Sequence, residues 1–190
     1  MRAVLAVRVA RPLRASSSCK ARTACARHRQ KGDTMAIATF AAGCFWGVEQ
    51  RFAQLDGVSG TEVGYTGGSA PHPTYEQVCS HSTGHAEAVR LEYDPERITY
   101  EQLLAAFFGM HDPTQMNRQG PDVGDQYRSA IFFQTAEQAD AARAAIGALQ
   151  EEGRLRRPIV TAVAAAPQWW PAEDYHQKYF EKHGRSGCAI

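Results

Sequence analysis

The sequence predicts an α+β fold, a two-layer sandwich in which helices pack on one face of a mixed β-sheet. Short apolar runs of strand length alternate with segments whose apolar residues recur at helical spacing, in the order β-α-β-β-α-β-α-β. The first six elements follow the βαββαβ order of a ferredoxin-like core. The 190 residues contain no internal repeat and no apolar run of about 18 residues, the length that spans a bilayer. We therefore expect one soluble domain with no membrane partner.

The first half of the chain supplies three strands and one helix. Ala36–Ala42 is an apolar run that breaks at Gly43. A helix follows, because Val48, Phe52 and Leu55 recur at helical spacing. Two further strands are expected at Val58–Tyr65 and His85–Tyr93.

Two long segments interrupt this regular pattern. Thr66–Gly84 is so rich in glycine and proline that only Thr74–Val78 can make a helical turn. His111–Gly124 is a second long loop. Loops of this length commonly carry binding and catalytic residues.

The second half begins with a helix over Tyr100–Met110, which Thr99 can cap. The remaining elements are a strand at Gln126–Gln134, an alanine-rich helix at Ala136–Glu152, a strand at Ile159–Ala165, a short helix after Trp169-Trp170-Pro171, and a glycine-rich tail at Gly184–Ile190.

The N-terminal segment differs sharply in charge from the rest. Residues 1–32 hold nine bases and no acid, which leaves 12 bases against all 20 acids in residues 33–190. An Arg-rich, acid-free N-terminus is typical of an organelle transit peptide, so residues 1–34 are expected to direct the protein to a mitochondrion or chloroplast. The alternative is a basic arm that binds nucleic acid, which the acidic domain disfavours. Met35 offers an alternative start for a cytosolic form, and residues 35–190 form the expected catalytic domain.

The five cysteines do not follow a structural pattern. Cys19 and Cys25 lie in the presumed transit segment, which leaves Cys44, Cys79 and Cys188. Three cysteines without C-x-x-C spacing argue against a disulfide scaffold and against a structural zinc site. No metal is expected.

Cys44 is a candidate nucleophile, in the stretch A-A-G-C-F-W-G-V-E from Ala41 to Glu49. A cysteine at the first turn of a helix meets unpaired backbone N–H groups and the positive end of the helix dipole, which favour the thiolate. The alternative is a small buried residue at a tight turn.

The stretch T-G-H-A-E-A-V, Thr83 to Val89, supplies a candidate proton donor. His85 and Glu87 share one face of the expected strand. A carboxyl near the aromatic rings of Phe45 and Trp46 would keep its proton at neutral pH. The alternatives are a salt-bridged Glu87 and a hydrogen-bonded His85.

Six motifs together resemble the methionine sulfoxide reductases of type A. They are G-C-F-W-G, G-Y-T-G-G, P-T-Y, G-H-A-E-A-V, H-D-P-T and G-x-D-x-G-x-Q-Y-R-S, which occur in the family's order over residues 38–134. The D-Y-H-Q-K-Y stretch at 174–179 adds further similarity. This resemblance implies the reduction of methionine S-sulfoxide, free or in proteins, without a bound cofactor.

The resemblance also implies a role for each matching position. Cys44 would attack the sulfoxide sulfur, and Glu87 would protonate the oxygen with help from Tyr75 and Tyr127. Substrate-binding roles fall to four residues, namely Phe45, Trp46, Asp122 and His85. Aromatic surface beside a sulfur nucleophile suits a substrate made of a methyl, a sulfur and one polar oxygen.

Recycling requires a second thiol, because loss of the oxygen leaves Cys44 as a sulfenic acid. Cys188 is the candidate, in a tail that glycines make adaptable, and thioredoxin or another dithiol would then reduce the disulfide. Cys188 as an uninvolved surface thiol is the alternative, and Cys79 is expected to pack. We expect a monomer.

Two rival functions remain at this level. One is a Cys-His hydrolase or acyltransferase that uses Cys44 with His85. The other is a non-catalytic binder of oxidised methionine.

Overall fold

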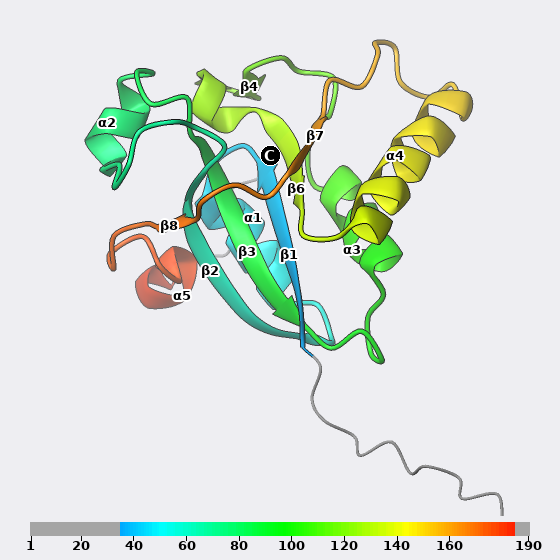
Figure 1. Ribbon diagram of the computed structural model, residues 1–190, viewed down its shortest axis with the longest axis horizontal. Helices are drawn as coiled ribbons and strands as arrows, with labels where there is room; N and C mark the ends of the chain where they lie inside the picture. The colour runs from blue at the N-terminus through cyan, green and yellow to red at the C-terminus, as the bar shows by residue number, and fades with distance from the viewer. Residues whose placement is uncertain (1–34, 185–190) are drawn as a thin grey trace, which may run out of the picture. The chain divides into compact units, whose positions relative to one another are not determined.

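The computed structural model describes residues 35–184 of the chain, which contain a six-stranded sheet in the order β7-β6-β1-β3-β2-β8 (Figure 1). Neighbouring strands are antiparallel except for β6 and β7, which are parallel. The order β6-β1-β3-β2 is that of a ferredoxin-like core. The strands are β1 (Ala36–Ala42), β2 (Val58–Thr66), β3 (Ala86–Tyr93), β6 (Ser129–Phe133), β7 (Ala162–Ala165) and β8 (Trp170–Pro171).

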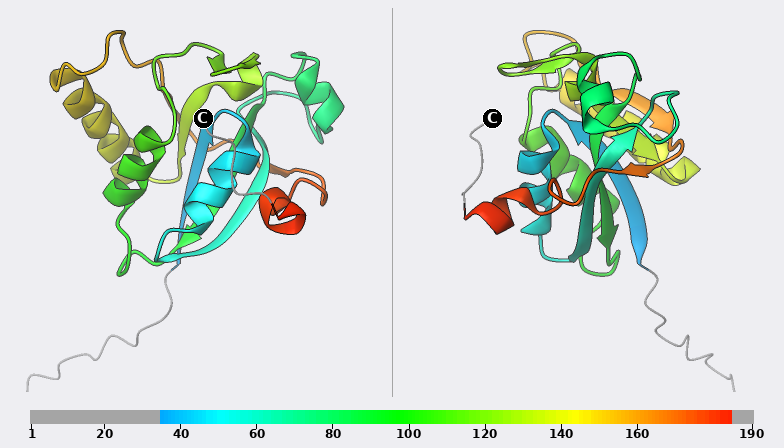
Figure 2. Two further views of the ribbon diagram at one scale, coloured as in Figure 1. Left: turned by 180° about the vertical axis from the view of Figure 1, so that it is seen from behind. Right: turned by 90° about the vertical axis from the view of Figure 1, so that its left-hand side faces the viewer.

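Helices cover one face of this sheet. In the rear view of Figure 2, α1 (Phe45–Ala53) lies in front of the strands and α3 (Tyr100–Gly109) lies beside it. The alanine-rich helix α4 (Ala136–Glu151) packs against α3 and the strands at the β6–β7 edge. Apolar side chains from both layers form the core, in which Phe40 of β1 stacks on Phe52 of α1 at 5.2 Å between ring centroids.

Threonine caps fix where three helices begin. Thr99 accepts a hydrogen bond from the Gln102 backbone N–H, and the Gln102 side chain accepts one from the Thr99 N–H. Thr135 caps α4, and Thr74 caps the short helix α2 (Tyr75–Cys79) in the same manner. A capping side chain satisfies an amide that the helix itself leaves unpaired.

The opposite face of the sheet is lined by small residues and crossed by a strap. We call residues 166–171 the strap, which runs over the sheet from β7 to the far edge, where it becomes β8 (Figure 1). Trp169 packs on a patch that includes Ala41, Ala86 and Ala88. Small side chains allow the strap to lie close to the strands. None of the helices among residues 35–184 has the length and apolarity needed to cross a membrane.

The expected α+β fold is confirmed, with four local differences. Residues Asp125–Tyr127 form a 3-10 turn, η1, before β6 instead of extending the strand. The loop 111–124 contains a small hairpin of β4 (Arg118–Gln119) and β5 (Asp122–Val123). Strand β7 is shorter than expected, and β8 was not anticipated. The expected short helix is α5 (Tyr179–His183), while the presumed transit segment and Cys188 lie outside the described residues.

Candidate active site

Cys44 stands at the junction of β1 and α1, where it is the N-cap residue of the helix. Gly43 precedes it with φ of +94°, a backbone conformation that favours glycine. A Cβ at Gly43 would lie 2.8 Å from the Cβ of Gln119, so the glycine also lets the loop 111–124 approach the site. Cys44 is half-buried and not part of a disulfide. The expected strand-to-helix position is therefore where the structure places it.

Glu87 points from β3 toward the same helix end. Its carboxyl is 1% exposed, and Oε2 accepts a hydrogen bond of 3.0 Å from the Phe45 backbone N–H. Burial raises the pKa of Glu87 to about 8; the Phe45 hydrogen bond lowers it and the Asp122 carboxylate raises it further. The carboxyl therefore holds a proton at neutral pH, next to the residue that follows Cys44.

Two tyrosines bring their hydroxyls to Glu87 from separate loops. Tyr75 is the first residue of α2, and Tyr127 ends η1. Burial raises the pKa of Tyr75, as do its hydrogen bond to Cys79 and the charge of Glu87. Burial likewise raises the pKa of Tyr127, followed by the charges of Glu87 and Cys79. Both hydroxyls stay protonated and can donate hydrogen bonds beside the carboxyl.

Asp122 is a second acidic residue beside Glu87. It lies half-buried in β5, and its carboxylate is near enough to raise the pKa of both Glu87 and Tyr127. The negative charge of Asp122 therefore favours the protonated forms of Glu87 and Tyr127.

Aromatic rings wall the other side. Phe45 and Trp46 follow Cys44 directly, and both pack against the ring of His176, at centroid distances of 5.1 and 5.5 Å. The Trp46 indole N–H donates to His176 Nδ1 at 3.1 Å, and Tyr179 stacks on Trp46 at 3.8 Å. The ring of His176 thus adds a third wall, from the C-terminal segment, to the aromatic surface of Phe45 and Trp46, and we call these three rings the aromatic cup.

His176 is the residue that sequence reasoning missed. It is 1% exposed, and its Nε2 has no hydrogen-bond partner among the described residues, with Glu173 Oε2 at 3.9 Å. Burial lowers the pKa of His176, which keeps the ring neutral. The D-Y-H-Q-K-Y stretch contains this histidine, so the signal was present although no role was drawn from it.

Glu173 joins the C-terminal segment to α2 and to strand β2. Its Oε1 accepts from the Tyr75 backbone N–H at 2.9 Å, and its Oε2 accepts from the Tyr65 hydroxyl at 2.8 Å. This carboxylate fixes α2 against β2 and thereby sets the position of the Tyr75 side chain. Nothing in the sequence pattern marked it.

The ring of His85 binds backbone groups of the loop 66–84, which differs from the substrate-binding role expected of it. Its Nδ1 accepts from the Gly68 backbone N–H at 3.1 Å, so Nε2 carries the hydrogen and donates to the Ala70 carbonyl at 2.8 Å. Both ring nitrogens hold the loop 66–84 in place. The geometry favours the structural alternative, a hydrogen-bonded histidine, over a substrate ligand.

Cys79 lies closer to the site than its position in the loop suggested. Its thiol hydrogen bonds with the Tyr75 hydroxyl, and burial raises the pKa of Cys79. A thiol that keeps its proton is a poor nucleophile. This placement agrees with the expectation that Cys79 packs.

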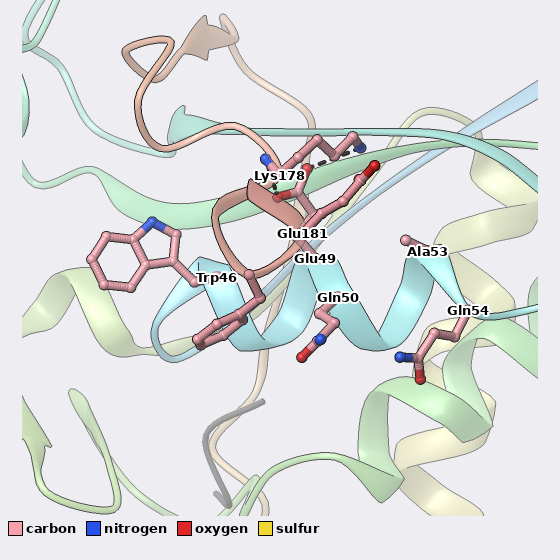
Figure 3. Close-up of a pocket in the computed structure, with 8 residues that line it drawn as sticks. Trp46, Glu49, Gln50, Ala53, Gln54, Lys178 and Glu181 are labelled. Carbon is pink, nitrogen blue, oxygen red and sulfur yellow. Dashed lines mark hydrogen bonds and ion pairs between the residues drawn. The ribbon is translucent and has the colours of Figure 1, made fainter. Parts of the chain in front are cut away.

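A pocket of about 270 Å³ lies beside this centre, between α1 and α5 (Figure 3). Trp46 lies at one end of it, and Glu49 and Lys178 form an ion pair of 3.0 Å in its wall. Neither Cys44 nor Glu87 lines it. The pocket therefore adjoins the aromatic cup without containing the reacting groups.

The chain matches known proteins over the whole described domain. The family model described as peptide methionine sulfoxide reductase matches residues 36–190. A peptide methionine sulfoxide reductase MsrA from Acidobacterium capsulatum is 56% identical over 82% of this chain and 100% of its own. Another from Geobacter metallireducens is 56% identical over 80% and 93%.

Solved structures agree with the sequence comparisons. Reduced Mxr1 from Saccharomyces cerevisiae has a TM-score of 0.75 at 32% identity, over 82% of this chain and 89% of its own. Methionine sulfoxide reductase A of Corynebacterium diphtheriae has a TM-score of 0.74 at 36% identity, over 83% and 79%. The resemblance drawn from the six motifs is confirmed: this chain belongs to the peptide methionine sulfoxide reductases of type A, which reduce methionine sulfoxide in protein repair.

Proposed function

We propose that Cys44 attacks the sulfur of methionine S-sulfoxide while Glu87 gives its proton to the oxygen. The observation that carries this is the protonated, buried carboxyl of Glu87, which the Phe45 amide holds one residue from the nucleophile. An oxygen bound to a proton leaves sulfur far more readily than a bare oxide. The sulfoxide gains two electrons and becomes methionine, and Cys44, which supplies them, takes the oxygen as a sulfenic acid.

Tyr75 and Tyr127 hold the sulfoxide oxygen in this scheme. Both hydroxyls keep their protons next to Glu87, so each can donate a hydrogen bond to the oxygen as the negative charge on it grows. Asp122 helps to order the part of the site around Glu87, and its negative charge helps to keep the proton on the Glu87 carboxyl.

The aromatic cup selects the epimer. The substrate methyl lies against Phe45 and Trp46, while the oxygen must reach Glu87 on the other side of the pocket. A chiral sulfoxide satisfies both demands in one configuration only, the S epimer. His85 takes no part, and with both its ring nitrogens engaged it cannot serve as base for a Cys44 hydrolase.

Recycling is assigned to Cys188 and an external dithiol, thioredoxin. Cys188 condenses with the sulfenic acid, which forms a disulfide and releases water. Support comes from α5, where Tyr179 stacks on Trp46, two residues from Cys44. From Gly184 at the end of α5, four residues can span about 14 Å to Cys188. Yeast Mxr1 has been crystallised in complex with Trx2, which shows such a partner for that protein.

The test separates the two half-reactions. Cys188→Ser should still convert about one equivalent of sulfoxide per enzyme in a single turnover, because the attack by Cys44 does not involve the tail. Steady turnover with thioredoxin should collapse, while dithiothreitol, a small reductant, should support it in part. Cys44→Ser should abolish both phases. Full thioredoxin-supported turnover in Cys188→Ser would overturn the recycling role.

Residues 1–34 are proposed to carry the protein to a mitochondrion or chloroplast, on the strength of their basic, acid-free composition. Fusion of this segment to a fluorescent protein tests the proposed localisation, and a diffuse cytosolic signal would contradict it. The domain itself is proposed to be a monomer, which sedimentation of residues 35–190 measures.

A further inference from the structure

The two catalytic tyrosines come from loops that touch each other through one pair of side chains. His81 follows α2, which begins with Tyr75, and Asp125 begins η1, which ends with Tyr127. His81 Nδ1 lies 3.1 Å from Asp125 Oδ1. The contact therefore spans the gap between the two elements that carry the hydroxyls.

The backbone around this contact is unusual on both sides. His81 has φ of +59°, a left-handed conformation that costs a non-glycine residue about 1 kcal/mol or more. Opposite it, Gly124 has φ of +149°, and a Cβ there would come within 2.5 Å of His81 Cε1. The imidazole thus lies directly on the backbone of the turn that leads into η1. The same Cβ would lie even closer to Gln126 Oε1, so both His81 and Gln126 pack closely on this glycine.

A second contact holds the same loops together independently. Arg128 Nη2 donates to the Gly84 carbonyl at 3.0 Å, and Nη1 donates to the Asp125 carbonyl at 2.8 Å. Loss of the His81 contact should therefore change the spacing of the loops without unfolding them.

We propose that His81 and Asp125 form a clasp that holds α2 and η1 at the spacing at which the hydroxyls of Tyr75 and Tyr127 can bind one sulfoxide oxygen. His81 is in this sense a positioning residue. It acts through the tyrosines and does not touch the substrate. The inference rests on the proposed oxygen-binding role of those tyrosines.

The clasp lies near the surface. The charged groups of η1 on this side are the Asp125 carboxylate and the Arg128 guanidinium, which binds the Asp125 carbonyl, while Ser80 and Ser82 flank His81 on its own loop. The side chains of His81 and Asp125 are 51% and 31% exposed, so water screens the pair and its contribution stays modest.

His81→Gly is the discriminating variant, because glycine removes the clasp and relieves the left-handed backbone at once. We expect the single-turnover rate constant for methionine sulfoxide reduction to fall by about two- to fivefold, the scale of an exposed ion pair. The melting temperature should stay unchanged or rise. An unchanged rate constant would overturn the clasp, and a fall in the rate constant that tracks a fall in melting temperature would reduce His81 to a structural role.

Asp125→Asn tests the charge, since asparagine can still hydrogen bond to a neutral imidazole. Because the hydrogen bond is kept and only the charge is lost, the ratio of native to variant kcat/KM should be about twofold or less, smaller than the effect of His81→Gly. Asp140→Asn, which breaks the exposed pair of Asp140 with Arg143 on α4, is the matched control and should give a ratio of one. A larger loss in Asp125→Asn than in His81→Gly would overturn the clasp, because Asp125 would then act without His81.

Tyr75→Phe and Tyr127→Phe distinguish failure of the clasp from failure of the proposed function. If either tyrosine variant slows reduction and His81→Gly does not, the oxygen-binding role stands and the clasp is wrong. If neither tyrosine variant slows reduction, the proposed function itself has failed at this step.

Discussion

Glu87 and Glu49 are buried to nearly the same degree, at 1% and 2% exposure, yet their partners are opposite in character. Glu87 accepts one hydrogen bond from the Phe45 amide, and the charged group that acts on it is another carboxylate, Asp122. Glu49 lies in α1 and accepts from the Lys178 backbone at 2.9 Å, from Lys178 Nζ at 3.0 Å and from the Thr61 hydroxyl at 3.1 Å.

This difference explains how two buried carboxyl groups beside one helix can serve different purposes. A buried carboxyl without a cation keeps its proton, because desolvation disfavours the charged form. A buried carboxyl with a cation and several donors can be retained as a structural ion pair. Burial alone therefore does not identify a catalytic acid, whereas burial without a cation, beside Cys44, supports the role proposed for Glu87.

The largest effect should come from Glu87→Gln. Glutamine can keep the hydrogen bond from the Phe45 amide but cannot give up a proton, so the fold is retained and the acid is lost. We expect kcat/KM for methionine S-sulfoxide to fall by about 10²- to 10⁴-fold, while the free energy of unfolding at neutral pH stays equal to or above that of the native protein. Steady-state kinetics and urea unfolding measure the two quantities. Turnover equal to that of the native enzyme would remove Glu87 from the mechanism.

The same substitution at the other carboxyl should have the reverse outcome. Glu49→Gln leaves the ammonium group of Lys178 without its counter-charge, which should lower the free energy of unfolding by about 2 kcal/mol. Lys178 is 36% exposed, and this screening keeps the cost below that of a fully buried pair. Rates in a single turnover should change by less than about threefold. A variant as stable as the native protein would show that the ion pair contributes nothing.

The smallest effect, counted per pH unit, is the pH dependence of stability that Glu87 produces. Its pKa of about 8 lies above the usual value of an unfolded glutamate, so its stabilising contribution is complete below about pH 4 and is lost as pH rises toward 8. The free energy of unfolding of the native protein should fall relative to Glu87→Gln by about 1 kcal/mol per pH unit between pH 5 and 8. Parallel stability curves for the two proteins would rule out the raised pKa.

A second buried group sets the opposite slope and serves as an internal reference. Burial lowers the pKa of His111 to about 4, so its contribution is lost as pH falls from about 6.5 through 4. Its Nδ1 donates to the Phe107 carbonyl, and its Nε2 accepts from the Ser129 hydroxyl. Because His111 is present in both proteins, the loss of stability that it causes at low pH cancels when the stability curves of the native protein and Glu87→Gln are subtracted.

Local sequence patterns were sufficient for most of the fold and for the chemically active residues. The apolar run Ala36–Ala42 became β1 with the same bounds, and Thr99 capped α3 as expected. Cys44 and Glu87 lie within motifs of five or six neighbouring residues, so their environment could be predicted from the residues around them. Tyr127 was expected in the strand Gln126–Gln134, whereas the structure places it at the end of a 3-10 turn before that strand.

Contacts between distant segments were the part that could not be predicted. Glu173 binds the Tyr75 backbone across 98 positions, and His176 accepts from Trp46 across 130. No periodicity links residues so far apart, because these contacts exist only once the strap has crossed the sheet. The surroundings of His85 could not be predicted for the same reason. Its ring nitrogens bind the Gly68 amide and the Ala70 carbonyl, which tertiary folding brings to it.

The route of the strap has a consequence for the order of events during synthesis. A ribosome releases the N-terminal strands first, so the thiol of Cys44 and the carboxyl of Glu87 are made long before residues 173–176 leave the tunnel. Until then the cup lacks the His176 wall and α2 lacks its Glu173 anchor. The aromatic cup is therefore completed only in the final moments of translation. A chain terminated after β7 would keep Cys44 and Glu87 beside a cup without its His176 wall.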